Sequence, residues 1–162
     1  MEKKDRKMFP LYVDLSDKTI VVAGGGFIAE RRITSLLDFA GKIIVTAPEV
    51  TSVLEELHRE GRIVLQKREF NVKDIDGADI VLAATSDSDL NEDIYRICKA
   101  RNITVNISDN QEKCDFFFPG IIRYGDIVIG FSSGGSDHRK TKEVRQKVEA
   151  FLKNEDTSGG TF

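Results

Sequence analysis

The segment VVAGGGFIAE, residues 21–30, restricts the possible folds more than any other part of the sequence. A corner of three glycines joins a short β-branched apolar run to a stretch whose apolar residues recur at helical spacing. Gly24, Gly26 and Ala29 stand in the G-x-G-x-x-G/A arrangement: Gly24 permits the tight turn, Gly26 lets a pyrophosphate approach the backbone, and Ala29 lets the helix pack on the strand. The free N–H groups of the helix N-terminus can then hold the phosphates. The pattern therefore predicts a dinucleotide-binding loop, the alternative being a glycine-rich turn that binds nothing.

Strand and helix patterns alternate through the following hundred residues. Short apolar strands are predicted at residues 19–23, 43–47, 63–66, 80–84 and 103–107, with helical spacing between most of them. This alternation is typical of an α/β fold of the Rossmann type, a doubly wound parallel sheet with helices on both faces. No helix separates the apolar runs of residues 116–131, so we expect further strands or a hairpin through Tyr124, Gly125 and Asp126.

The C-terminal region predicts a small extension for dimerisation. After the expected hairpin, Val144, Val148, Phe151 and Leu152 recur at the spacing of one helix face, while basic residues occupy the opposite face. The predicted organisation is an NAD-binding Rossmann domain at 1–110, dimerisation strands and a helix at 111–153, and a disordered tail at 154–162. The apolar helix face and the hairpin predict a homodimer.

Composition and charge exclude several classes of protein. Lys and Arg number 24 against 27 Asp and Glu, and a net charge of −3 gives no field to hold a polyanion, so no nucleic-acid partner is expected. The absence of both a long apolar run and an N-terminal signal region predicts a cytoplasmic protein with no membrane contact. Cys98, Cys114, His58 and His138 form no ligand spacing of a zinc site, so no metal site is predicted.

The second predicted strand bears on the choice of nucleotide. In dinucleotide-binding proteins an acidic residue near this strand's end often binds the ribose 2′-OH, and Glu49 is the nearest candidate. Glu49 could equally stabilise the first turn of the next helix. Because no arginine in this loop favours a 2′-phosphate, the sequence favours NAD over NADP.

Polar residues follow the fourth and fifth predicted strands. In a doubly wound sheet the ligand crevice lies at the carboxyl ends of the strands, so Thr85 and Asp109 are expected to face it. Thr85 could hydrogen-bond the cofactor, although the SDSD segment after it is typical of a helix cap. Asp109 is either a general base at the crevice or an ordinary turn residue in an Asn/Asp-rich stretch.

Several ordered segments resemble the precorrin-2 dehydrogenases of the sirohaem pathway, also found as the N-terminal part of sirohaem synthase. The similar segments cover residues 9 to about 136: FPLYVDL, VVAGGGFIAERR, AATSDSDLN, NISD and FFFPGIIRYGDIVIGFSSGG. The resemblance implies NAD-dependent oxidation of precorrin-2, a tetrapyrrole, to sirohydrochlorin, with Fe²⁺ insertion into the product as a further activity of some members.

The same resemblance implies roles for individual residues. It places the corner along the NAD pyrophosphate, the end of the second strand at the adenosine ribose, and the family's essential carboxylate at Asp109. The residues concerned are Gly24, Gly26, Phe27 and Ile28 for the pyrophosphate, and Pro48 and Glu49 for the ribose. Two other functions stay open: an NAD-sensing regulatory module without turnover, and a tetrapyrrole carrier.

Overall fold

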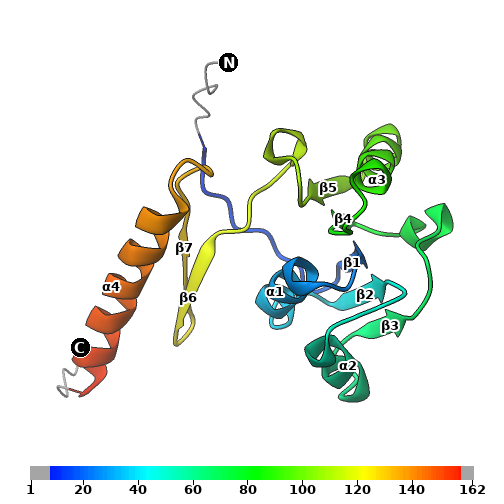
Figure 1. Cartoon of the computed structure of the whole chain (residues 1–162). Coiled ribbons are helices and arrows are strands. Elements are labelled where there is room, and N and C mark those ends of the chain that lie inside the picture. Colours follow the sequence, from blue (N-terminus) through cyan, green and yellow to red (C-terminus); the bar gives the residue numbers. More distant parts are fainter. Residues whose placement is uncertain (1–7, 158–162) are drawn as a thin grey trace. The chain divides into compact units, whose positions relative to one another are not determined.

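The computed structural model describes residues 8–157, with side chains as far as 154, and divides into two compact units (Figure 1). The sheet unit comprises residues 13–116. The hairpin unit comprises the described residues 8–12 and 117–157. Within residues 8–157, no helix combines the length and apolar character needed to cross a membrane.

The sheet unit is a five-stranded parallel sheet, as the alternation of strands and helices predicts. Its strand order is β3-β2-β1-β4-β5, and every neighbouring pair is parallel. This order and its connections confirm the Rossmann-type fold class. The elements are β1 (Thr19–Ala23), α1 (Phe27–Leu36), β2 (Lys42–Thr46), α2 (Ser52–Arg59), β3 (Val64–Gln66), the 3₁₀ turn η1 (Val72–Ile75), β4 (Ile80–Ala83), α3 (Ser88–Ala100), β5 (Thr104–Ile107) and the 3₁₀ turn η2 (Gln111–Lys113).

Both faces of this sheet are buried. On one face, Val21 and Ala23 of β1 share a fully buried cluster with Ile94 and Cys98 of α3. The chain winds from β1 through α1 to β2 in one direction and from β4 through α3 to β5 in the other. Right-handed crossovers therefore put α1 and α3 on opposite faces. This double burial explains why the strands read as continuous apolar runs rather than as alternating ones.

The hairpin unit contains the antiparallel strands β6 (Gly120–Tyr124) and β7 (Ile127–Phe131) and the helix α4 (His138–Thr157). The predicted hairpin through Tyr124, Gly125 and Asp126 is confirmed; Gly125 takes a φ of 55°, which glycine adopts readily. The Tyr12 hydroxyl donates to the carbonyl of Val128 at 3.0 Å and joins the N-terminal segment to β7. Helix α4 continues to Thr157; residues 158–162 of the expected tail lie outside the described residues.

Candidate functional site

The glycine corner connects β1 to α1 and lies against the residues that follow β4. Gly24 has a φ of 114°, and a Cβ atom added there would lie 2.3 Å from the carbonyl oxygen of Ala84. A Cβ atom on Gly25 would lie 2.5 Å from the carbonyl oxygen of Glu49. Only glycine fits where three chain segments approach so closely. The strand order reverses between β1 and β4, so this corner lies at the switch point where doubly wound sheets bind ligands.

Gly26 differs from its two neighbours because a Cβ atom there would meet open space. It is the N-cap of α1, and no side chain caps the N–H groups of the first helical turn. Phe27 and Ile28 follow with exposed fractions of 82% and 46%, whereas Ala29 is fully buried against the sheet. An open glycine, uncapped N–H groups and exposed apolar side chains at one helix N-terminus fit a nucleotide pyrophosphate. Direct contact of these residues with the cofactor stays a prediction.

The structure shows where Glu49 lies relative to helix α2. Helix α2 begins at Ser52, the Thr51 side chain accepts a hydrogen bond from the N–H of Leu54, and the acidic residue of the first turn is Glu55. Glu49 therefore lies before the helix cap rather than in the first turn, and both Pro48 and Glu49 are exposed. For Glu49, the ribose contact and an effect on the N-terminus of α2 both stay predictions.

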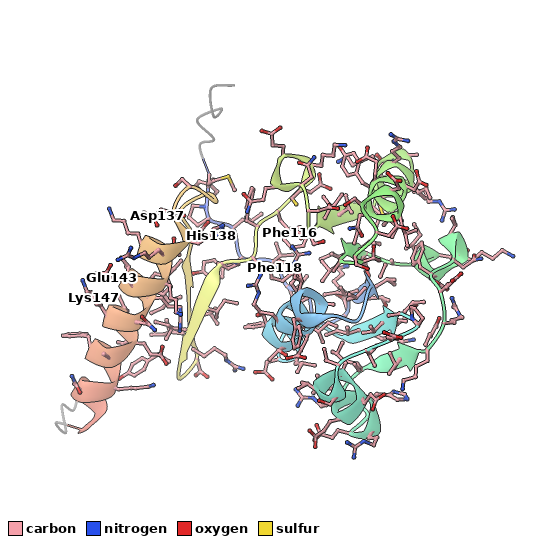
Figure 2. All side chains as sticks on the ribbon, viewed as in Figure 1. Phe116, Phe118, Asp137, His138, Glu143 and Lys147 are labelled. Atoms are coloured by element: carbon pink, nitrogen blue, oxygen red, sulfur yellow. The ribbon has the colours of Figure 1, made fainter. Side chains whose placement is uncertain are left out.

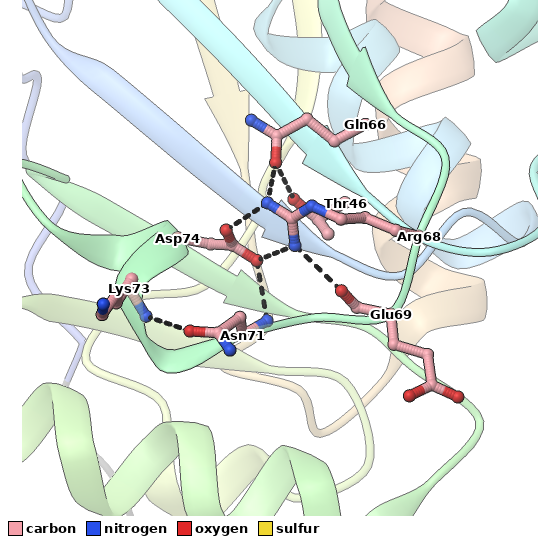
Figure 3. Close-up of polar contacts among 7 residues, drawn as sticks. All are labelled: Thr46, Gln66, Arg68, Glu69, Asn71, Lys73 and Asp74. Atoms are coloured by element: carbon pink, nitrogen blue, oxygen red, sulfur yellow. Dashed lines mark hydrogen bonds and ion pairs between the residues drawn. The ribbon is translucent and has the colours of Figure 1, made fainter.

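An arginine that the sequence pattern did not single out lies near the end of β2 (Figure 3). Arg68, just after β3, donates to both carboxylate oxygens of Asp74, at 2.8 and 2.5 Å. The same guanidinium donates to Gln66, whose side chain also accepts from Thr46, the last residue of β2. Hydrogen bonding by Arg68 lowers the pKa of Asp74, against the opposing effect of burial. The Arg68 charge is therefore already paired at this edge of the sheet.

A second network joins the polar residues after β4 and β5. The main-chain N–H of Thr85 donates to Oδ1 of Asn91 at 3.1 Å, and the Thr85 hydroxyl lies 2.8 Å from the same oxygen. Nδ2 of Asn91 donates to the Thr85 carbonyl and to Oδ2 of Asp109, each at 3.1 Å. The side chain of Asp87 caps α3 by accepting from the N–H groups of Asp89 and Leu90, as the SDSD segment predicts.

Sequence reasoning placed Thr85 and Asp109 at this edge and gave Asn91 no role. The structure brings the three side chains together and leaves Asp109 exposed, whereas Asn91 is fully buried. The sequence did contain one sign that Asn91 would be buried: it shares a helix face with the apolar Ile94 and Cys98, at positions i, i+3 and i+7. A polar residue on such a face needs hydrogen-bond partners.

Cys98 lies in the core of the sheet unit, and Cys114 lies in the loop after β5. Burial raises the pKa of the Cys98 thiol to about 11, so this side chain stays a neutral core residue. The Cys114 thiol donates to the carbonyl of Ile107 at 3.2 Å and helps to shape the loop after β5. His138 stands at the start of α4, beside Asp137 (Figure 2). Among the side chains of residues 8–154, no three His, Cys, Asp or Glu residues gather into a group suited to hold a metal ion.

Together, the parallel sheet, the glycine corner at its switch point and the open N-terminus of α1 define a dinucleotide-binding protein of the Rossmann class. Residues 11–120 match the profile of the family described as "Putative NAD(P)-binding", and the chain belongs to this family. That description agrees with the class of nucleotide expected from the corner.

Curated relatives and a solved structure extend this comparison. The chain is 35% identical over 144 residues to a siroheme synthase of Mannheimia succiniciproducens, covering 89% of this chain and 30% of that protein. It is 38% identical over 141 residues to a "probable multifunctional siroheme biosynthesis protein HemA" of Ruminiclostridium josui, covering 86% and 27%. These matches confirm the resemblance seen in the sequence, although the chain spans less than a third of either relative.

The solved structure named "SirC, precorrin-2 dehydrogenase" shares the fold, with a TM-score of 0.72. The match covers 88% of this chain and 70% of that one, at 23% sequence identity.

Proposed function

We propose that the chain catalyses the NAD-dependent dehydrogenation of precorrin-2 to sirohydrochlorin. The observation that carries this proposal is the pairing, at one edge of one sheet, of an open glycine corner with an anchored, exposed carboxylate. The ordered motifs quoted above and the siroheme synthase relatives support the choice of substrate. The chain covers about a third of the length of those relatives.

The residues at the corner fit a bound NAD. Gly26 leaves room for the pyrophosphate, the N–H groups that begin α1 would donate to it, and the exposed Phe27 and Ile28 would cover it. Pro48 and Glu49 would lie at the ribose. When bound, NAD⁺ supplies a hydride acceptor at C4 of its nicotinamide.

Asp109 is the residue to which we assign the proton. Dehydrogenation removes a hydride and a proton from the macrocycle, and an exposed carboxylate at the crevice can accept the proton as a general base. Asn91 holds Oδ2 of Asp109, and within the described residues no other side chain hydrogen-bonds this carboxylate. Oδ1 is therefore available to the substrate.

The Arg68 network supports NAD rather than NADP as the nucleotide. A protein that accepts a 2′-phosphate commonly presents an arginine near the end of the second strand. Arg68 reaches this region through Gln66 and is paired through both carboxylate oxygens with Asp74. A 2′-phosphate would have to compete with Asp74 for the guanidinium.

Three further parts of the hypothesis concern the partners and location of the protein. We expect a homodimer built on the hairpin unit, because Ile127, Val144 and Phe151 expose apolar side chains there. Insertion of Fe²⁺ into sirohydrochlorin would need removal of pyrrole protons, for which Asp109 is again the candidate base. A cytoplasmic location stays a prediction that cell fractionation can check.

The decisive experiment gives the purified chain precorrin-2 and NAD⁺ and follows NADH absorbance and the sirohydrochlorin spectrum. We expect both products in equal amounts. NAD⁺ binding without NADH formation would instead favour the regulatory module, and precorrin-2 binding without turnover would favour the carrier.

Two variants test the assigned roles. Gly26→Asp should abolish NAD⁺ binding in a fluorescence titration, because a carboxylate would occupy the pyrophosphate position. Thr34→Asp, which adds the same charge at an exposed position two turns along α1, should bind NAD⁺ normally.

Asp109→Ala should bind NAD⁺ normally and lose turnover by about a hundredfold or more. Asp93→Ala, at an exposed position of α3, should retain turnover.

A further inference from the structure

Asn91 is a buried primary amide with hydrogen-bond partners on both its oxygen and its nitrogen. Its side chain is completely inaccessible, and its two acceptor and two donor positions all face partners within 3.1 Å. A buried amide without partners costs about 1–3 kcal/mol, so the bonds to the Thr85 main chain and to Asp109 explain why this side chain is tolerated in the core.

The partners also determine which way the amide points. The main-chain N–H of Thr85 can only donate, so the atom that faces it must be Oδ1. The carbonyl of Thr85 and the carboxylate of Asp109 can only accept, so both must face Nδ2. Rotation of the amide by 180° would lose these bonds together, and Asn91 is therefore held in one orientation.

The three residues come from separate elements of the sheet unit. Thr85 follows β4, Asp109 follows β5, and Asn91 is in the first turns of α3 between them. The parallel register pairs Ala83 with Ile107, and the N–H of Ser108 donates to the carbonyl of Ala83 at 2.9 Å. The two loops that leave these strands are therefore neighbours, and Asn91 joins them at the carboxyl ends of the strands.

We propose that Asn91 is a positioning residue that orients the Asp109 carboxylate relative to the Thr85 main chain. This inference depends on the proposed function, in which Asp109 accepts the substrate proton and Thr85 faces the cofactor. Asp109 is exposed and follows a strand end in a bend, so its side chain would otherwise rotate freely. Holding Oδ2 fixes the direction in which Oδ1 is presented, and such orientation contributes strongly to proton transfer between bound groups.

Two variants separate the two sides of the amide. Asn91→Asp keeps an acceptor for the N–H of Thr85 and replaces the donor to Asp109 with a second carboxylate oxygen. Asn91→Leu removes both. Each should lower kcat about 10- to 100-fold while the Kd for NAD⁺ changes less than about threefold. Cys98→Ala is the matched control, since it shortens a buried side chain on the same face of α3 and should leave kcat unchanged.

A double-mutant cycle distinguishes orientation of Asp109 from a general effect on stability. In an Asp109→Ala background, Asn91→Asp should reduce the remaining turnover no further, because no carboxylate is left to orient. Equal fractional losses in the two backgrounds would overturn the proposal, as would normal kcat in both Asn91 variants. Turnover is expressed per NAD⁺-binding site, so that a variant with a lower folded fraction is still informative.

The same data separate this inference from the proposed function. If the unmodified chain forms no NADH from precorrin-2, the proposed function fails. If the unmodified chain turns over and the Asn91 variants match it, only the positioning role fails.

Discussion

The sheet unit and the hairpin unit differ sharply in how much apolar surface they bury. Among the described residues, the buried hydrophobic side chains belong to the sheet unit, with Ile122 of β6 as the exception. In the hairpin unit, Phe9, Ile127 and Phe151 have exposed fractions of 84%, 59% and 62%. One unit thus has a complete core, whereas the other presents apolar surface.

This difference indicates a division of roles. A parallel sheet covered on both faces holds the glycine corner and the Asp109 network in place, as the proposed nucleotide binding and proton transfer would require. The two-stranded hairpin packs against one helix and still leaves Ile127 and Phe151 exposed. Burial against a second copy of the chain would stabilise it, and four predictions test this contrast.

The largest expected effect concerns the corner of the sheet unit. Gly24→Val should destabilise this unit by about 4 kcal/mol or more, because the new side chain would overlap the Ala84 carbonyl at a φ of 114°. Gly77→Ala, at a φ of 78° with open space around it, should cost only about 1 kcal/mol. Urea unfolding measures the free energy of unfolding of both variants. If both lost the same amount, the effect of Gly24→Val would come from backbone strain alone and not from overlap with the Ala84 carbonyl.

The second prediction compares the two cores directly. Ile94→Ala should lower the free energy of unfolding of the sheet unit by about 3 kcal/mol, since it leaves a cavity at a fully buried site. Ile122→Ala should speed amide hydrogen exchange in β6 and β7 and leave β1 and β4 protected. Exchange that accelerates in all four strands would show that the two units unfold together.

The third prediction concerns the ion pair between Arg68 and Asp74. In the folded protein the pKa of Asp74 lies below its ordinary value of 3.8. The pair therefore contributes its full stabilisation at pH values above 3.8. This stabilisation is lost as the pH falls through the lower, folded-state pKa. Asp74→Asn should cost about 1–2 kcal/mol at pH 7 and flatten the decline of stability below pH 4. Thermal unfolding between pH 2.5 and 7 measures the effect, with Asp126→Asn in the hairpin loop as control.

The smallest expected effect on unfolding comes from the exposed face of α4. Val144→Asp combined with Phe151→Asp should change the stability of the sheet unit by less than about 0.5 kcal/mol and convert the proposed dimer to monomer. Gln146→Asp combined with Ala150→Asp adds the same charge at exposed positions of the helix and should leave the dimer intact. Sedimentation equilibrium distinguishes these outcomes, and an unchanged mass in the first variant would remove this face from the interface.

Much of the fold could be predicted from local sequence patterns. The apolar runs predicted all five strands of the sheet to within a residue or two, and the break in rhythm after residue 116 predicted the hairpin. The boundaries of helices were harder to predict: α2 begins at Ser52, directly after the Thr51 cap. Capping depends on a side-chain hydrogen bond, which apolar spacing does not record.

The residues of the candidate site could be predicted only in part. Gly24, Gly26, Thr85 and Asp109 were named from their places after strands, because the carboxyl ends of parallel strands meet at one edge. Arg68 and Asp74 escaped notice, since they lie beyond the loop in which a nucleotide-selective arginine was sought. Their link to Thr46 at the end of β2 runs through a side chain on the neighbouring strand β3.

The sequence by itself determined the glycine corner, the winding of the sheet and the edge at which chemistry would occur, because these follow from backbone sterics and from the spacing of apolar residues. Only the tertiary structure decided that Asn91 would join Thr85 to Asp109 and that Arg68 would pair with Asp74. Such side-chain contacts depend on the register between neighbouring strands, in which Ala83 lies beside Ile107 and Thr46 beside Gln66. That register is set by packing on both faces of the whole sheet, and no short segment of the chain contains it.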